Sequence, residues 1–119
     1  MVWKQSKYHN KKVIVDGIKF DSKAEATRWQ ELKLLEKAGE IENLRRQQEY
    51  ILIPKSKYGR AIKYKADFVY YTHWLENGLM QYGYVVEDVK SKATITPVYK
   101  LKKRMMQEKL GITIKETFM

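Results

Sequence analysis

The stretch AIKYKADFVYYTHWLENGLMQYGYVVEDVKSK, residues 61–92, decides the fold of this chain. Asn77-Gly78 is a strong signal for a two-residue β-turn, and both flanking arms are rich in Val, Ile, Tyr and Phe. The stretch therefore predicts a long antiparallel hairpin whose arms are central strands of a sheet.

The last strand of this hairpin turns from apolar to charged residues. Alternation along VVEDVKSK puts Asp88 and Lys90 on one face with Val86, and Glu87 on the other face. Continuing the pairing outward from the turn places Asp67 directly opposite Asp88, with Cβ atoms roughly 5 Å apart. Two carboxylates at that distance repel each other unless a cation lies between them, and Mg²⁺ suits oxygen ligands. This end of the hairpin is therefore a candidate metal site.

The same pairing sets Lys65 opposite Lys90. A bulge near Gly83 would shift the register by one residue and send the two acids to opposite faces. Lys90 is either a solvated lysine at a strand end or, because it shares a face with Asp88, a group that orients a water or balances charge on a phosphate.

The segments around the hairpin predict further strands and two helices. Residues 13–15 and 18–20 form a small hairpin about Asp16-Gly17, and a strand in the second half of NLRRQQEYILIP ends at Pro54. One helix follows Ser22 and stops at Ala38-Gly39. A second helix begins at Thr96-Pro97 and runs to Leu110, and a short strand at 112–114 closes the chain.

This order predicts a mixed α/β class, in which a mostly antiparallel, mixed sheet is flanked by two helices. The length of 119 residues suits a single domain at residues 1–119, with a basic N-terminal arm at residues 1–11. Cysteine is absent and the two histidines are far apart, so the sequence offers no thiol nucleophile and no His or Cys zinc site. We expect no membrane partner and a cytoplasmic location, because no apolar run has the length of a membrane span.

Glu25 is a third acid with two interpretations. On a helical wheel it shares a stripe with Ser22, Trp29 and Leu32, so it lies on the face that packs on the sheet. Taken alone, Ser22 and Glu25 favour a capping box, in which the glutamate only bonds the first helical amide. The acids of the hairpin make a site role for Glu25 the competing hypothesis.

The formal net charge of +10 indicates a polyanionic partner or merely keeps the chain soluble. The distribution of the charge favours a nucleic acid, because lysines and arginines form clusters that also contain tyrosines (Tyr8, Tyr58, Tyr64, Tyr99). The clusters are the N-terminal arm (Lys4, Lys7, Lys11, Lys12), the loop region (Lys55, Lys57, Arg60, Lys63, Lys65) and the second helix (Lys100, Lys102, Lys103, Arg104). On that helix we expect an apolar side with Val98, Leu101 and Met105, opposite a basic side with Lys100, Lys103 and Arg104.

A helix that begins SKAE, an aspartate in KADF, Asp88-Val89-Lys90 at a strand end and a basic helix together resemble the PD-(D/E)XK nuclease superfamily. Residues 12–116 look more closely like small phage and prophage proteins described as Holliday-junction-resolvase-like. The resemblance implies a restriction-endonuclease-like core, one or two Mg²⁺ or Mn²⁺ ions, and hydrolysis of phosphodiester bonds in DNA, branched DNA such as Holliday junctions in particular. It also implies the cytoplasm of a bacterial host.

Carried over, the resemblance implies that Asp67, Asp88 and the Val89 carbonyl are metal ligands. The resemblance also implies that Glu25 is the helix-borne acid, with a catalytic and metal-binding role, and that Lys90 is the catalytic lysine. Gln47 matches a supporting polar position and Lys100 a basic position on the second helix. Ala66 stands where the superfamily's name has proline, and Glu87 competes with Asp88 for the middle acid.

Two other functions stay open. The chain could be a nucleic-acid-binding module without cleavage activity, or part of a phage replication or packaging complex that binds an acidic protein. Selection by DNA shape is favoured over selection by sequence, since no base-reading motif is present. Cutting a junction symmetrically would favour a homodimer.

Overall fold

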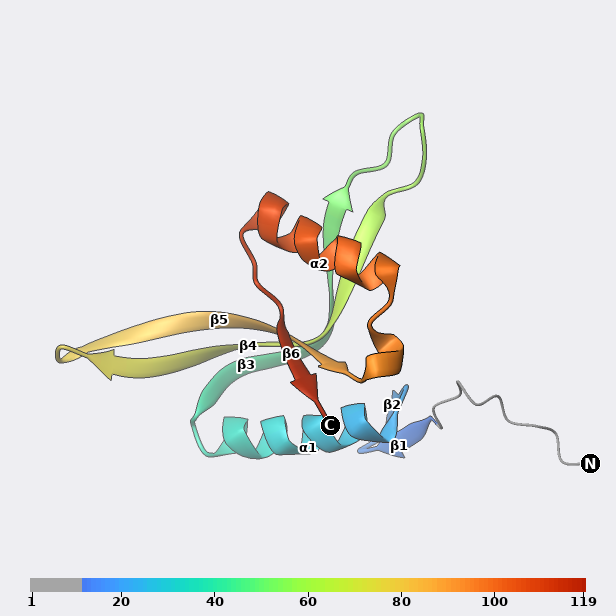
Figure 1. Ribbon diagram of the computed structural model, residues 1–119. Helices are drawn as coiled ribbons and strands as arrows, with labels where there is room; N and C mark the ends of the chain where they lie inside the picture. Colours follow the sequence, from blue (N-terminus) through green and yellow to red (C-terminus); the bar gives the residue numbers. More distant parts are fainter. Residues whose placement is uncertain (1–11) are drawn as a thin grey trace, which may run out of the picture.

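The computed structural model describes residues 12–119, so the predicted basic arm at residues 1–11 lies outside the described part (Figure 1). Its elements are β1 (Val13–Val15), β2 (Ile18–Phe20), α1 (Lys23–Lys37), β3 (Ile41–Ile53), β4 (Ile62–Glu76), β5 (Leu79–Lys90), a 3-10 turn (Lys92–Thr94), α2 (Pro97–Leu110) and β6 (Lys115–Phe118). The predicted mixed α/β class is confirmed. Within residues 12–119 no helix is both long and apolar enough to cross a membrane.

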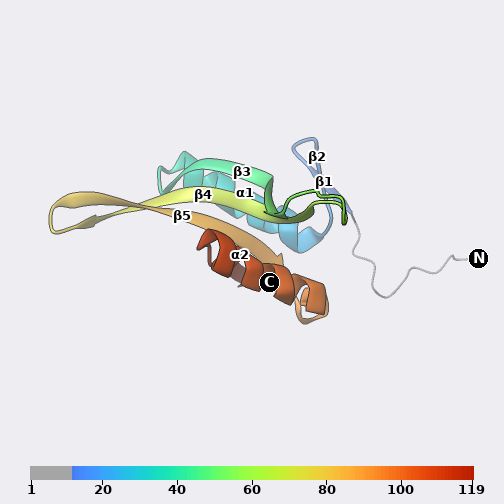
Figure 2. The same ribbon diagram turned by 90° about the horizontal axis from the view of Figure 1, so that it is seen from above.

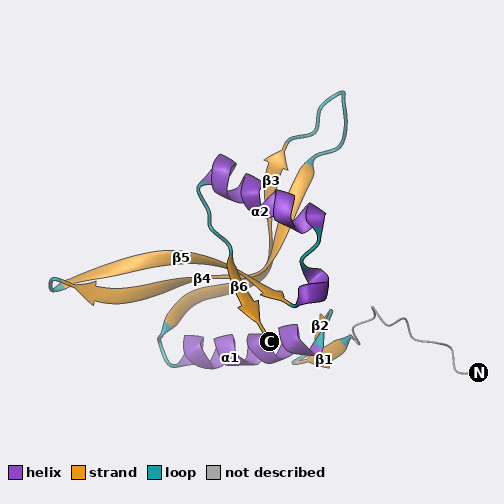
Figure 3. Ribbon diagram, viewed as in Figure 1, coloured by secondary structure: helices purple, strands orange, loops and turns teal. Residues whose placement is uncertain are grey.

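The main sheet has the strand order β3-β4-β5-β6, and β1 and β2 form a separate small hairpin (Figure 3). β3, β4 and β5 pair antiparallel, whereas β6 lies parallel to β5. β6 can run parallel to β5 because α2 and the loop after it return the chain to Glu87, where the pairing of β5 with β6 begins.

The two helices cover opposite faces of this sheet (Figure 2). α1 packs on one face through a cluster that includes Trp29, Leu32 and Phe68. α2 packs on the other face through a cluster that includes Tyr99 and Met106. The sheet is therefore the middle layer, and its central strands are buried from both sides.

Both helices begin and end as the sequence predicts. Ser22 Oγ accepts the N–H of Glu25 at 3.1 Å, and Thr96 Oγ1 accepts the N–H of Tyr99 at 3.1 Å. Gly111 closes α2 with a φ of 68°, in the left-handed region that glycine adopts without a steric cost.

The register of the β4–β5 hairpin is confirmed as far as Phe68 and Glu87, which are the last paired residues. Gly83 pairs with Thr72 without a bulge. The predicted pairing of Lys65 with Lys90 is wrong, because the two strands separate before they reach it. Lys65 instead pairs with Glu49 of β3.

Two strand boundaries differ from the predictions. β3 spans all of Ile41–Ile53, since bulges between Glu42 and Arg45 and near its end accommodate the polar residues. The last strand is Lys115–Phe118 and not 112–114, because Ile114 is buried in the cluster under α2. The prediction followed the apolar residues Ile112 and Ile114, but these pack in the core before β6 begins. The strand itself is mostly polar.

The predicted apolar side of α2 is wrong for Val98 and Leu101, whereas Met105 packs against the core cluster as predicted. Val98 and Leu101 are 62% and 58% exposed, and Tyr99 and Met106 are the buried residues. The buried stripe is therefore rotated by one position, which turns Lys103 from the expected solvated side toward the sheet.

Candidate active site

Asp67 and Asp88 lie where β4 and β5 separate, just beyond their last paired residues. The backbone N–H of Asp67 donates to Asp88 Oδ1 at 3.0 Å, and the N–H of Val89 donates to Asp67 Oδ2 at 2.9 Å. Each carboxylate therefore accepts a backbone N–H that the pairing of β4 with β5 leaves free. The two acids come together as predicted, although they are not paired partners in the ladder.

Asp67 sits at the point where β4 changes the face that its side chains present. Ala66 belongs to the cluster under α2, whereas Phe68, two residues on, belongs to the cluster under α1. Regular alternation would put both on one face. The facing residue in β3 is Gln47, which has a left-handed φ of 56° and is skipped, with Asp67, by the ladder. The irregularity places Asp67 between the two layers.

Glu25 reaches this region from the first turn of α1 and is 6% exposed. Gln47 Nε2 donates to Glu25 Oε1 at 3.2 Å, and Arg46 Nη2 lies 3.8 Å from the same oxygen. The guanidinium of Arg46 also lies over the ring of Phe20 at 4.8 Å. Gln47, the predicted supporting residue of the site, hydrogen-bonds Glu25 directly. Ser22 caps the helix that carries Glu25.

Lys90 packs inside the site and is not a solvated strand end. Its Nζ lies 3.5 Å from Asp88 Oδ2 and 3.7 Å from the centre of the Tyr99 ring. The Tyr99 hydroxyl donates to Glu116 Oε2 at 2.8 Å, and Lys103 Nζ lies 3.1 Å from the same oxygen. Residues of β5, α2 and β6 therefore form one connected group around Lys90.

Negative charge is concentrated at the site. Burial raises the pKa of Asp67, and the charges of Asp88 and Glu25 raise it further, against the Val89 N–H and Lys90. Burial likewise raises the pKa of Glu25, with added effects of Asp21 and Asp88 that Arg46 and Gln47 oppose. These carboxylates repel one another at short range, which is the situation that a bound cation relieves.

The donor atoms fit a hard divalent cation by their chemistry. Asp67, Asp88 and Glu25 offer carboxylate oxygens, the ligands that Mg²⁺ and Mn²⁺ take in proteins. As they stand, no three Asp, Glu, His or Cys side chains within residues 12–119 form a group that could hold a metal ion. Asp88 Oδ2 also accepts the Tyr64 hydroxyl at 2.5 Å. A metal-binding arrangement therefore requires these side chains to exchange protein partners for the ion.

Glu87 points to the opposite face from Asp88 and has different partners. Arg28 donates to both of its carboxylate oxygens, at 2.6 and 3.2 Å, and Tyr70 and Thr117 donate to it as well. Burial alone would raise the pKa of Glu87, but the hydrogen bonds from Arg28, Tyr70 and Thr117 outweigh it and hold the pKa below its usual range. Glu87 is a neutralised structural acid, which leaves Asp88 as the candidate middle acid.

One family of proteins matches nearly the whole chain. A family described as Protein of unknown function (DUF1064) matches residues 5–118. The chain belongs to this family. No curated protein and no solved structure matches it.

The basic residues of this DUF1064 protein lie in several places. Lys55, Lys57 and Arg60 are exposed in the loop between β3 and β4, which extends beyond the sheet in Figure 1. Lys63 and Lys65 are exposed on β4, and Lys100 and Arg104 on α2, where Arg104 pairs with Glu108. Lys103 is half-buried beside Glu116, so its predicted place on a solvated basic face is wrong.

Sequence reasoning misses several polar partners of the site. It assigns Tyr64 and Tyr99 to nucleic-acid contacts among the bases, but both are buried and bond Asp88 and Glu116. It does not single out Arg46 or Glu116 at all. No pattern could have found them, since β4 changes face at Asp67 and Glu116 arrives on a strand whose register only the fold defines.

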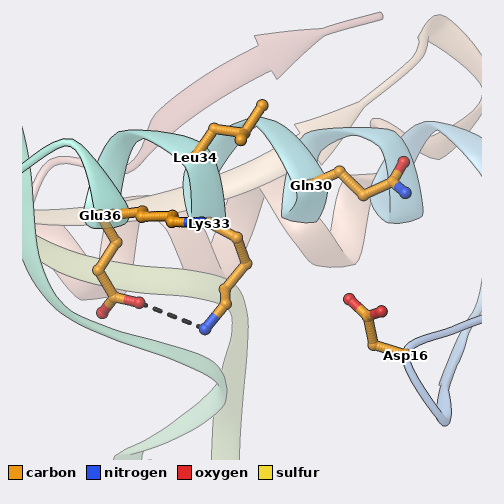
Figure 4. Close-up of a pocket in the computed structure, with 6 residues that line it drawn as sticks. Asp16, Gln30, Lys33, Leu34 and Glu36 are labelled. Carbon is orange, nitrogen blue, oxygen red and sulfur yellow. Dashed lines mark hydrogen bonds and ion pairs between the residues drawn. The ribbon is translucent and has the colours of Figure 1, made fainter.

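A surface pocket of about 520 Å³ lies elsewhere on this DUF1064 protein, along α1 (Figure 4). It is lined by Asp16, Gln30, Lys33, Leu34, Glu36 and Lys37. Figure 4 shows Lys33 paired with Glu36, so these charges are already matched. The pocket contains none of the predicted site residues, and the candidate site remains the carboxylate group between β4 and β5.

Proposed function

We propose that the protein is a metal-dependent DNA endonuclease that hydrolyses phosphodiester bonds and selects branched DNA such as Holliday junctions. One observation carries the proposal: Asp67, Asp88 and Lys90 lie together where β4 and β5 separate, with Glu25 brought to the same place by α1. The resemblance to the PD-(D/E)XK superfamily supports the same residues in the same order.

In this proposal Asp67, Asp88 and Glu25 hold Mg²⁺ or Mn²⁺, with the Val89 carbonyl as a further ligand. The ion would lower the pKa of a bound water and offset charge on the scissile phosphate. Lys90, held against Asp88 and the Tyr99 ring, is positioned to orient the attacking water. Gln47 and Arg46 fix Glu25 and keep its carboxylate aimed at the site.

The exposed lysines and arginines of the β3–β4 loop and α2 would bind the DNA backbone. Lys55, Lys57 and Arg60 have no acidic partner within ion-pair distance in the described part of the chain. Such contacts position a duplex without reading its sequence, which favours selection by DNA shape.

The test is cleavage of labelled four-way junction, flap, single-stranded and linear duplex DNA with Mg²⁺, with Mn²⁺ and with EDTA. Asp88→Asn keeps the size of the side chain and removes one charge. We expect metal-dependent cleavage of the wild type, with the junction cut fastest, and a loss of about 100- to 1,000-fold in Asp88→Asn. Lys90→Met should lose activity to a similar extent.

Asp16→Asn is the matched control, since it removes a carboxylate in the β1–β2 turn, where asparagine tolerates the positive φ of 52°. It should cleave like the wild type. Circular dichroism and urea unfolding establish that each variant is folded. DNA binding without cleavage under either metal would reject the endonuclease and favour a binding module. Failure to bind any of the DNAs would reject both.

A further inference from the structure

The outer half of the β4–β5 hairpin, residues 71–84, projects away from the body of the molecule as an arm that is two-stranded beyond Thr72 (Figure 1). β3 pairs with β4 only up to Thr72, and β6 pairs with β5 only from Glu87. The longest dimension of the described chain is 63 Å against 25 Å for the shortest. An isolated two-stranded ribbon is marginally stable in water, so burial of the arm against a partner surface would stabilise it.

One face of the arm is largely aromatic and apolar, with His73 as its polar residue, whose Nε2 lies 2.7 Å from the Gly39 carbonyl oxygen. Tyr71 and Tyr84 are paired there with ring centroids 5.1 Å apart, followed by His73 with Tyr82 and then by Leu75 with Met80. The exposed fraction is 62% for Tyr82 and 69% for Leu75. Together these side chains expose on the order of 500 Å², a patch size that is often functional on a small protein.

The outer edge of β5 in the arm is a free strand edge in the described part of the chain. In a two-residue hairpin the residues next to the turn bond each other, so Glu76 and Leu79 form a bonded pair. Leu79, Gln81 and Gly83 therefore bond β4, and the residues that alternate with them, Met80, Tyr82 and Tyr84, direct their N–H and C=O groups outward. Proteins normally protect such edges with lysine, proline or a bulge, and this edge has none of them.

Charge identifies the partner. No Lys or Arg occurs between Lys65 and Lys90, although the chain has 24 of them in all. A nucleic-acid backbone needs cations, which the arm does not provide. A second copy of a chain with net charge +10 is repelled least at a surface that carries no lysine or arginine. Antiparallel pairing of two arms would also keep the two basic bodies at opposite ends.

We infer that the arm is a homodimerisation element, in which the β5 edges of two copies pair antiparallel about a two-fold axis near Tyr82. Such pairing joins the two four-stranded sheets into one continuous sheet. It also places the aromatic faces of the two arms side by side. The inference does not depend on the proposed nuclease activity.

Sedimentation equilibrium of Tyr82→Pro and Tyr82→Thr tests the edge pairing. Proline removes the outward N–H and leaves the bonds between β4 and β5 intact, and threonine removes the ring but keeps the N–H. Between about 1 and 100 μM the wild type should have twice the chain mass of 14.2 kDa. Tyr82→Pro should raise the dimer Kd at least about tenfold beyond Tyr82→Thr. A monomeric wild type, or equal constants for the two variants, would overturn the inference.

A cross-link gives an independent readout should proline unfold the arm. The chain contains no cysteine, so a single Tyr82→Cys substitution introduces the sole thiol. Across the proposed axis the two thiols lie within disulfide range, and mild oxidation should yield a covalent dimer. Gln81→Cys, on the other face of the arm, is the control and should cross-link at least about tenfold more slowly. Equal rates would refute the pairing, as would a monomeric wild type whose binding of single-stranded DNA is weakened by Tyr82→Ala.

Discussion

The backbone of Gln47 shows how one residue positions the candidate site. A φ of 56° costs a residue with a Cβ about 1–2 kcal/mol relative to the right-handed region. In return, the Gln47 amide reaches Glu25, and the facing Asp67 is released from the ladder to lie beside Asp88. Strain of this kind persists where the surrounding structure uses it.

Asn43 has the same φ of 56° as Gln47 but lies exposed and away from the carboxylates, so a glycine at Asn43 is a matched control for a glycine at Gln47. Gln47→Gly should leave stability within about 1 kcal/mol of the wild type, because relief of strain offsets the missing hydrogen bond. It should lower the cleavage rate about 10- to 100-fold through the misplaced Glu25. Urea midpoints and single-turnover cleavage measure both effects.

Asn43→Gly should raise stability by up to about 1 kcal/mol without changing cleavage. Equal cleavage rates for the two glycine variants would show that Gln47 has no role beyond the strand. A loss of stability in Gln47→Gly well above about 1.5 kcal/mol would show that its hydrogen bond outweighs the strain.

At the scale of the element, β5 presents two consecutive acids to two different layers. Glu87 faces α1 and is neutralised by Arg28, and Asp88 faces α2 and is held by Tyr64 and Lys90. One strand therefore fastens a helix with one carboxylate and supplies the candidate site with the next. The alternation of the strand makes this separation of roles possible.

Arg28→Met should destabilise the protein by about 3–5 kcal/mol, because it leaves the fully buried carboxylate of Glu87 without its bidentate partner. Adding Glu87→Leu should recover part of that loss, since the unpaired charge is then gone. Urea denaturation gives the free energies of unfolding.

Arg104→Met is the control, because the Arg104–Glu108 pair is exposed. Its effect should stay below about 0.5 kcal/mol. If Arg28→Met cost no more than Arg104→Met, the buried pair would not fasten α1 to β5.

At the scale of the whole molecule, the positive charge and the apolar surface are separated. The β3–β4 loop and α2 expose lysines and arginines, and the arm at residues 71–84 has none. Figure 1 shows the loop and the arm extending in different directions from the central layers. A basic surface for DNA and a surface without lysine or arginine for a second copy are therefore compatible on one chain.

The triple variant Lys55→Ala, Lys57→Ala, Arg60→Ala should weaken DNA binding and reduce the salt dependence of the binding constant. The slope of log K against log salt should fall by about one for each phosphate that the variant no longer neutralises. Fluorescence anisotropy at several salt concentrations measures it. The control removes the same number of charges on β2 and α1, by Lys19→Ala, Lys33→Ala and Lys37→Ala, and should leave the slope unchanged. Equal slopes for the two triple variants would exclude the loop as the DNA surface.

The sequence by itself determined the elements whose signals are local. Asn77-Gly78 set the hairpin and its register, Ser22 and Thr96 set the helix starts, and alternation separated Glu87 from Asp88. These features depend on turn chemistry, capping and a period of two, and each of them acts over a few residues.

Only the tertiary structure decided the features that depend on distant segments. The face change at Asp67 requires the left-handed Gln47 on the neighbouring strand, and Tyr64 joins Asp88 only because of it. The polar strand β6 forms because β5 offers an edge, and its Glu116 then meets Tyr99 of α2. Local propensity contains no information about these partners, because the free energy that fixes them comes from packing between layers.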